Sequence, residues 1–396
     1  MNSTQHTRTR HPDPSAAPAS GPRARRLLGC LAVGAVLLGG CTGASSAGSA
    51  PPPTSASSAG SSVGDHLDEA MRGIIGFSGS VVVARGDQVL LSRGYGRADV
   101  ARGTANGPTT RFDIGDLTEQ LTGAAILQLQ RQGRLSVEDP VCRYLPRCPV
   151  AWRPITIHHL LTHTSGLPNV GDLPEFETSL VTPTTPAEEL SWVHGLPLKF
   201  TPGSNFRLSM TGYLVLGMVI EKVSGTTYPR FLSAAVLAPL GMVDTGYDSG
   251  DDGVAVGYTT GSRPAAVTDR SAGGAAFGLY STAPDLLLWE RGLVTGRLLG
   301  ATATAAMTTP AFEDTDVHQF GFAYGTYASL GPGPRVLERY AGTGGFRSFL
   351  SHDMGTGVTV VVLANQEQTA NLYEVGLLME QTLRSTQQRR EHPAAR

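Results

Sequence analysis

The chain has 396 residues, of which 40% are hydrophobic and 16% are charged, and its formal net charge is −2 at pH 7. These values are ordinary for a globular protein of one large domain or two small ones. Because basic residues concentrate in the leader, the rest of the chain is mildly acidic, which argues against DNA or RNA as a partner.

Residues 1–40 are predicted to be an export signal. Basic residues at 23–26 precede an apolar stretch at 27–38, which has the length of a signal-peptide core. A membrane-spanning helix would need about 20 apolar residues. The stretch ends in Leu-Gly-Gly-Cys at 38–41, which resembles a bacterial lipobox. Cys41 is therefore predicted to carry lipid and to anchor the protein to the outer face of the cell membrane. The alternative is an ordinary signal peptide, and export by the Sec or the twin-arginine route stays open.

The rest of the chain divides by composition. Ser, Ala, Gly and Pro dominate the region after Cys41, which is typical of a flexible tether. We expect a lipidated Cys and linker at 41–64, a folded body at 65–384 and a polar tail at 385–396. Within the body, the sheet should come from about 65–110 and 270–384, with a helical insertion at about 111–269.

Strand and helix patterns support this division. Apolar runs at 80–84 and 89–92, and again at 346–351 and 358–363, are separated by Gly- and Asp-containing turns, which predicts two hairpins. Helical patterns cover 67–73, 117–132, 211–223 and 371–383. Strands at both ends with helices between them indicate an α/β (α+β) fold, in which one sheet carries the first and last helices on one face.

Four cysteines occur in the sequence. Cys30 leaves with the leader and Cys41 takes the lipid. Cys142 and Cys148 would then remain in an oxidising compartment, six residues apart, and we predict a disulfide between them. The alternative is two unpaired buried thiols. No histidine cluster nearby favours zinc, and no pattern indicates another metal or a cofactor.

Four motifs carry a family resemblance. Residues 155–168 read ITIHHLLTHTSGLP, residues 239–245 read PLGMVDT, and Gly-rich motifs follow at 272–286 and 342–349. These motifs, in this order, resemble the serine β-lactamase (class C) and penicillin-binding-protein-like family over the whole folded body. The resemblance implies a β-lactamase/transpeptidase-like fold, with a central antiparallel sheet, an all-helical subdomain and the site between them.

The family's catalytic positions are occupied by other residue types. The resemblance implies Ser-x-x-Lys at a helix start, Tyr-x-Asn on a loop, and Lys or His on a strand before a Gly-rich turn. The matching positions hold Asp116, Glu119, Leu208, Met210 and Arg339. A carboxylate cannot form the acyl-serine ester and cannot act as an amine base. Because such residues act as a unit, their joint loss removes the family reaction.

Three interpretations of the carboxylate pair are open. Asp-x-x-Glu is a helix-capping pattern, in which Asp116 would accept backbone N–H groups and Glu119 would reach back. The pair could also bind an amine or a cation, or it could act as an acid/base dyad. Arg339, Thr343 and Arg347 are further candidates for ligand binding, since an arginine can hold a carboxylate with two hydrogen bonds.

The histidines of the first motif are expected to be structural. His158 and His159 stand at a predicted helix start, where satisfied polar residues are common. His163, Thr164 and Ser165 resemble a structural turn of the family rather than a Ser/His pair.

The sequence therefore predicts a non-catalytic binding or scaffolding lipoprotein of the cell envelope, and by family analogy its ligands would be peptidoglycan peptides or cell-wall proteins. The alternative is a hydrolase of the β-lactamase, esterase or DD-peptidase class with a non-standard mechanism. Thr118 or Ser209 would then be the nucleophile, although Thr118 lies on a different helix face from Asp116 and no base for Ser209 is visible in the sequence.

Overall fold

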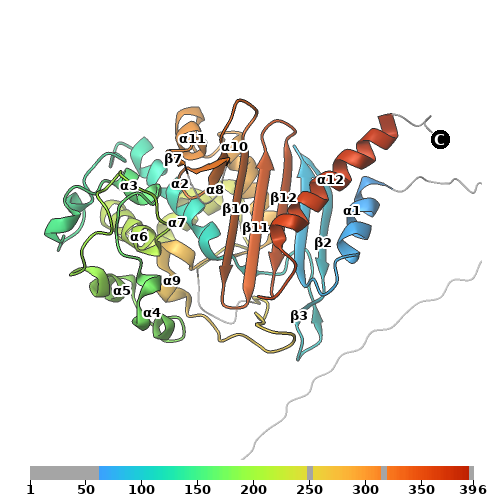
Figure 1. Cartoon of the computed structure of the whole chain (residues 1–396), viewed down its shortest axis with the longest axis horizontal. Helices are drawn as coiled ribbons and strands as arrows, with labels where there is room; N and C mark the ends of the chain where they lie inside the picture. The colour runs from blue at the N-terminus through green and yellow to red at the C-terminus, as the bar shows by residue number, and fades with distance from the viewer. Residues whose placement is uncertain (1–61, 248–252, 314–318, 392–396) are drawn as a thin grey trace, which may run out of the picture. The chain divides into compact units, whose positions relative to one another are not determined.

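The computed structural model describes residues 62–247, 253–313 and 319–391 (Figure 1). The predicted leader, Cys41 and nearly all of the linker lie outside the described residues. No helix in the described part of the chain has the length and apolar character that a membrane span requires.

A large antiparallel sheet forms the centre of the folded body, and its strands come from both ends of the chain (Figure 1). The strand order is β2-β1-β12-β11-β10-β9-β8-β7. The strands are β1 Gly79–Arg85, β2 Gln88–Tyr95, β7 Phe312–Glu313, β8 Phe320–Phe322, β9 Tyr327–Ser329, β10 Val336–Thr343, β11 Phe346–Asp353 and β12 Val358–Ala364. Two small ladders pair β3 Arg97–Asp99 with β4 Thr104–Ala105, and β5 Phe112–Asp113 with β6 Tyr280–Ser281.

The two predicted hairpins are present. They correspond to β1 with β2 and to β11 with β12, and β1 also pairs with β12, so that Val81 lies opposite Val362. The central residues of β1 and β12 are uniformly apolar because these two strands are covered on both faces. Val82 contributes to one hydrophobic core, whereas Val81 and Val83 contribute to the other.

The first and last helices cover one face of the sheet, as the sequence pattern predicts (Figure 1). Helix α1 spans Val63–Arg72 and α12 spans Leu372–Glu391. Their apolar side chains Leu67 and Met379 are fully buried against the strands. Helix α1 begins at a capping box in which Ser62 and Asp65 satisfy each other's backbone N–H groups.

The other face and the helical part share a second core. Its helices are α2 Thr118–Arg131, α3 Ile157–Leu161, α4 Pro174–Ser179, α5 Pro186–Val193, α6 Met210–Ser224, α7 Tyr228–Leu232, α8 Ala238–Leu240, α9 Arg270–Phe277, α10 Ala283–Val294 and α11 Ala301–Thr308. Short helical turns lie at η1 Gly115–Leu117, η2 Val141–Arg143, η3 Val150–Trp152, η4 Val170–Asp172 and η5 Ser233–Leu237. Helix α10 packs on β1 and β12, while α2, α6 and α9 pack on one another.

Three predicted boundaries differ from the structure. Helix α1 begins at Val63, which is within the region predicted to be linker up to residue 64. The tail predicted from residue 385 is not irregular at its start, since α12 continues to Glu391. The chain does not return to the sheet at about 270, since α9 to α11 come first and β7 begins at Phe312.

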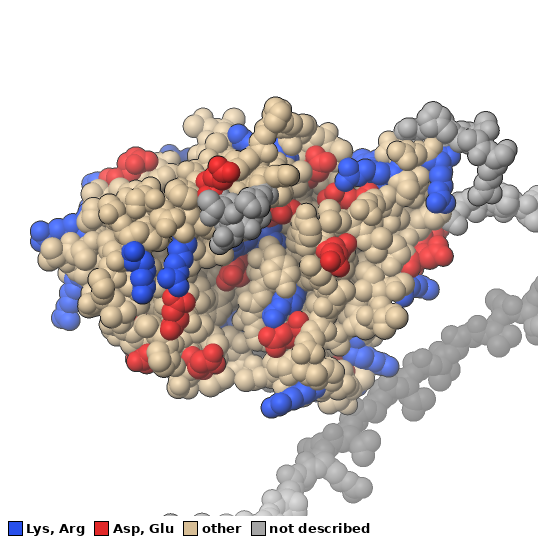
Figure 2. Space-filling view, viewed as in Figure 1, with Lys and Arg blue, Asp and Glu red and all other residues tan. Residues whose placement is uncertain are grey.

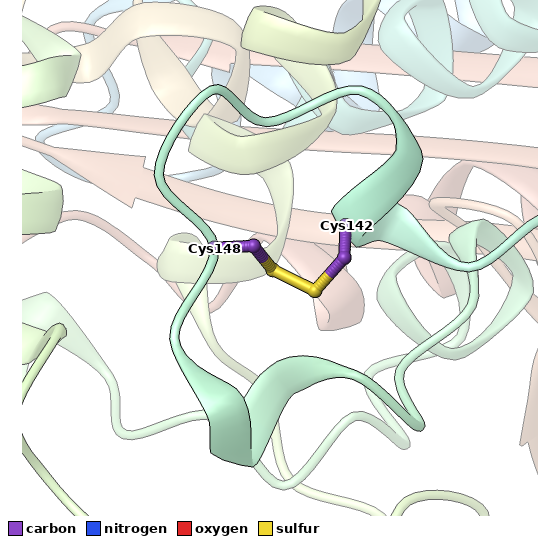
Figure 3. Close-up of a disulfide and its surroundings, with 2 residues drawn as sticks. All are labelled: Cys142 and Cys148. Carbon is purple, nitrogen blue, oxygen red and sulfur yellow. A yellow bond between two sulfur atoms is a disulfide. The ribbon is translucent and has the colours of Figure 1, made fainter.

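The predicted disulfide is present (Figure 3). Cys142 lies in η2 and Cys148 precedes η3, and their Cα atoms are 5.2 Å apart. The bridge closes a six-residue separation at the edge of the helical part.

Candidate functional site

The site begins at the turn between β5 and α2. Gly115 has φ +55°, a conformation that favours glycine, and a Cβ there would lie 3.2 Å from the backbone of Gly342 in β10. The Ser348 hydroxyl of β11 donates a hydrogen bond of 2.9 Å to the Ile114 carbonyl. These contacts hold η1 and the start of α2 against β10 and β11, so that Asp116 and Glu119 lie beside Arg339 of β10.

The capping interpretation of Asp116 and Glu119 is wrong. Ile114 is the N-cap of η1 and Leu117 is the N-cap of α2, and neither helix start has a side-chain capping bond. The turn η1 moves the start of α2 beyond Asp116. The Glu119 carboxylate instead pairs with the guanidinium of Arg339 in β10.

Glu119 forms a buried ion pair with Arg339 of β10. The distance from Arg339 Nη2 to Glu119 Oε2 is 2.5 Å, and the exposed fractions of the two residues are 2% and 1%. The guanidinium also lies 5.2 Å from the ring centroid of Phe322, close enough for a cation–π contact. Removing one partner of such a pair would leave an uncompensated charge in the protein interior.

His163, for which the sequence predicts a structural role, joins the Glu119–Arg339 pair. Its Nε2 lies 3.3 Å from Glu119 Oε2, and its Nδ1 accepts a 3.2 Å hydrogen bond from the backbone N–H of Ser209. Because Nδ1 is an acceptor, the single ring proton is on Nε2 and the ring is neutral. The Nε2–H group then donates a hydrogen bond to Glu119. The residue has φ +55°, which is uncommon for a non-glycine residue.

We refer to Asp116, Glu119, His163 and Arg339 as the Arg339 network. No local sequence signal could have placed His163 in it, since 44 residues separate His163 from Glu119 and 220 separate Glu119 from Arg339.

Asp116 is the least buried member of the network. Its side chain is 35% exposed and lies 3.9 Å from Arg339 Nη2, beyond hydrogen-bond distance. Burial and the neighbouring Glu119 carboxylate raise the pKa of Asp116 to about 7, against the opposing effect of Arg339. This carboxyl group therefore titrates near neutral pH.

The other predicted site residues make different contacts. Leu208 is 43% exposed. The backbone N–H of Met210 donates to Asn169 Oδ1 at 3.0 Å, and α6 begins there. Thr343 ends β10 and pairs with Phe346. Arg347 forms an ion pair with Glu367 at 3.0 Å.

The two candidate nucleophiles are both buried. Thr118 Oγ1 accepts a 3.3 Å hydrogen bond from the backbone N–H of Leu279. Ser209 is 5% exposed, and its hydroxyl has no hydrogen-bond partner among the described residues.

Charges of both signs intersperse on the face seen in Figure 1 (Figure 2). This face has no large area of a single sign to attract a polyanion or a polycation.

The chain is similar to a group of known proteins. It matches the protein family described as Beta-lactamase over residues 65–378. PbpX of Bacillus subtilis (strain 168), a protein named for penicillin binding, is 31% identical over 278 residues, which cover 68% of this chain and 69% of PbpX. A crystal structure of a penicillin-binding protein from Bacillus halodurans has a TM-score of 0.70 at 27% identity, covering 80% of this chain and 98% of that chain. A D-stereospecific amidohydrolase from Streptomyces sp. has a TM-score of 0.66 at 25% identity, covering 79% and 96% of the two chains.

Proposed function

The chain belongs to the beta-lactamase family, with a penicillin-binding-protein-like fold, and from this premise we propose that it is a non-catalytic binding or scaffolding protein of the cell envelope. The resemblance places Asp116 and Glu119 at the positions of the nucleophilic Ser and its Lys. A carboxylate at each position can supply neither an attacking hydroxyl nor an amine base.

One observation carries the proposal: the buried pair of Glu119 with Arg339 at 2.5 Å. The amine of the family would have to stand free beside the nucleophile in order to accept a proton. Here a guanidinium is bound to a carboxylate, and arginine stays protonated at any working pH. Glu119, Arg339 and His163 are thus engaged with one another.

The proposed setting and ligands follow from the sequence and the relatives. The leader and Cys41 suggest a protein anchored by lipid to the outer face of the cell membrane. PbpX and the Bacillus halodurans protein are named for penicillin binding. For this chain we propose peptidoglycan peptides or cell-wall proteins as partners.

A hydrolase with a non-standard mechanism is the second candidate, favoured by the order Ser209, His163, Glu119 in space. The arrangement resembles a Ser-His-acid triad, and His163 is a base that the sequence did not reveal. However, His163 Nδ1 accepts the backbone N–H of Ser209 rather than its hydroxyl, and Ser209 is 95% buried, being 5% exposed. Both facts favour the binding role.

The two functions separate in a paired assay on the purified protein. Muropeptides should raise its melting temperature, whereas a nitrophenyl ester should be hydrolysed no faster than in buffer. A hydrolysis rate lost in Ser209→Ala or Thr118→Ala would establish the second candidate instead. A rate that survives both variants but vanishes in Asp116→Asn would point to an acid/base dyad.

A further inference from the structure

The Arg339 network carries one more negative charge than positive charge when Asp116 is ionised. Glu119 and Asp116 contribute two carboxylates, and Arg339 contributes one guanidinium. His163 adds no charge, because its Nδ1 is an acceptor and its proton lies on the side of Glu119. The guanidinium is hydrogen-bonded to Glu119 at 2.5 Å but lies 3.9 Å from Asp116. The unbalanced charge therefore belongs to Asp116.

The same carboxylate is the part of the network that solvent reaches. The Asp116 side chain is 35% exposed, whereas those of Glu119 and Arg339 are 2% and 3% exposed. The Asp116 side chain makes no hydrogen bond within the described part of the chain, so its carboxylate oxygens are available to donors from outside. A carboxylate prefers charged N–H donors, which form the shorter and stronger hydrogen bonds.

A second observation also points to a missing group. Arg339 is 98% buried, being 2% exposed, and its Nε–H has no acceptor among the described residues. Leaving a buried donor unpaired costs free energy. This unsatisfied donor belongs to the same network as Asp116.

An aromatic surface lies beside the network. The ring of Phe206 is 6.1 Å from that of His163 and stacks on Phe312 at 6.0 Å. Both phenylalanines are partly exposed. Such a surface suits the methylene groups next to an ammonium ion, and the ion itself is attracted to the ring faces.

We propose that Asp116 binds a primary ammonium group of the ligand, because Arg339 is hydrogen-bonded to Glu119 and lies farther from Asp116, while His163 donates to Glu119. This inference rests on the proposed binding function and names the chemical group that the site recognises. A lysine-type side-chain amine of a peptide has this chemistry.

The test compares two peptides that differ by one charge. The dissociation constants of Nα-acetyl-Lys-D-Ala-D-Ala and of its Nα,Nε-diacetyl form are measured by titration calorimetry with the wild type, Asp116→Asn and Asp87→Asn. Asp87 lies exposed in the turn between β1 and β2, away from the network, and undergoes the same chemical change. The free amine should bind the wild type and the Asp87→Asn protein about 10-fold more tightly than the acetylated peptide. In Asp116→Asn the two peptides should bind equally.

The inference is overturned if acetylation leaves the affinity of the wild type unchanged, or if the difference persists in Asp116→Asn. If neither peptide binds, the proposed peptide ligands are wrong, and n-butylammonium replaces them as the probe. A saturable rise in melting temperature with n-butylammonium, absent with n-butanol at equal ionic strength and absent in Asp116→Asn, would then support the ammonium site alone. No such rise would overturn the inference too.

Discussion

Two carboxylates compete for one guanidinium at the start of α2. Glu119 holds Arg339 at 2.5 Å, and Asp116 is left at 3.9 Å with a partly exposed side chain. Because their environments differ, the two acids are expected to behave differently toward protons, ligands and substitution.

Asp116 should make stability depend on pH in an unusual direction. Burial and Glu119 raise its pKa to about 7 from the model-peptide value of 3.8, with Arg339 opposing them. The folded state therefore binds the proton more tightly, and this residue lowers stability as the pH rises from about 4 to about 7. Asp116→Asn should raise the melting temperature more at pH 8 than at pH 5.

Melting curves of the wild type, Asp116→Asn and Asp87→Asn at the two pH values check this. The exposed Asp87→Asn variant should shift the melting temperature equally at both. An equal gain for Asp116→Asn at pH 5 and pH 8 would show that Asp116 has an ordinary pKa.

The Glu119–Arg339 pair should be costly to break from either side. Glu119→Gln and Arg339→Met should each lower the free energy of unfolding by about 3–5 kcal/mol, because each leaves a buried polar group unpaired. The double variant should lose less than the sum, with a coupling of about 0.5–3 kcal/mol. Urea unfolding of the four proteins measures the cycle.

The exposed pair of Arg207 and Asp172 is the matched control. Its atoms are 2.8 Å apart, but the side chains are 49% and 44% exposed. The same cycle there should give a coupling of at most about 1 kcal/mol. Equal couplings in the two cycles would refute the special role of the buried pair.

At the scale of elements, the contact of α2 with β10 limits which of the family's catalytic residues could be restored by substitution, because Arg339 of β10 lies against position 119. Glu119→Lys alone would place two cations side by side where the exposed fractions are 1% and 2%. We expect Asp116→Ser, Glu119→Lys, Leu208→Tyr and Met210→Asn together to destabilise the protein strongly. Adding Arg339→His, which removes the permanent second cation, should restore much of the loss. Melting temperatures test this prediction. Equal melting temperatures for the variants with four and with five substitutions would contradict it.

The disulfide loop stabilises the helical part locally. Cys142 and Cys148 are six residues apart, and closing so short a loop in the unfolded chain is worth about 2 kcal/mol. Cys142→Ser with Cys148→Ser should lower the free energy of unfolding by about that amount and leave muropeptide binding intact. A loss of binding without loss of stability would instead link the loop to the site.

The elements show which features local sequence can reveal. Apolar periodicity and turn residues predict the hairpins, α2, α6 and the sheet-covering helices α1 and α12. The number and spacing of the cysteines predict the disulfide. Such local patterns do not predict the Arg339 network, because its members come from η1, α2, the turn after α3 and β10, which only the tertiary fold brings together. Capping was a sound local interpretation of Asp116 and Glu119, but the attraction of a buried guanidinium overrode it.

For the whole molecule, the fold positions a polar network between the sheet and the helical part, as the family resemblance implies. The sequence identified three of its four members but not the pairing of Glu119 with Arg339, which decides what the site can do. A fold of this family in which Glu119 is bound to Arg339 and Asp116 is left partly exposed is suited to recognition rather than acyl transfer.

The most direct test of this account is the intact mass of the purified protein after incubation with excess benzylpenicillin. We predict an unchanged mass, because no activated hydroxyl faces solvent at the start of α2. A mass increase of one penicillin molecule, mapped by peptide sequencing to Ser209, Thr118 or another side chain beside the Arg339 network, would contradict it.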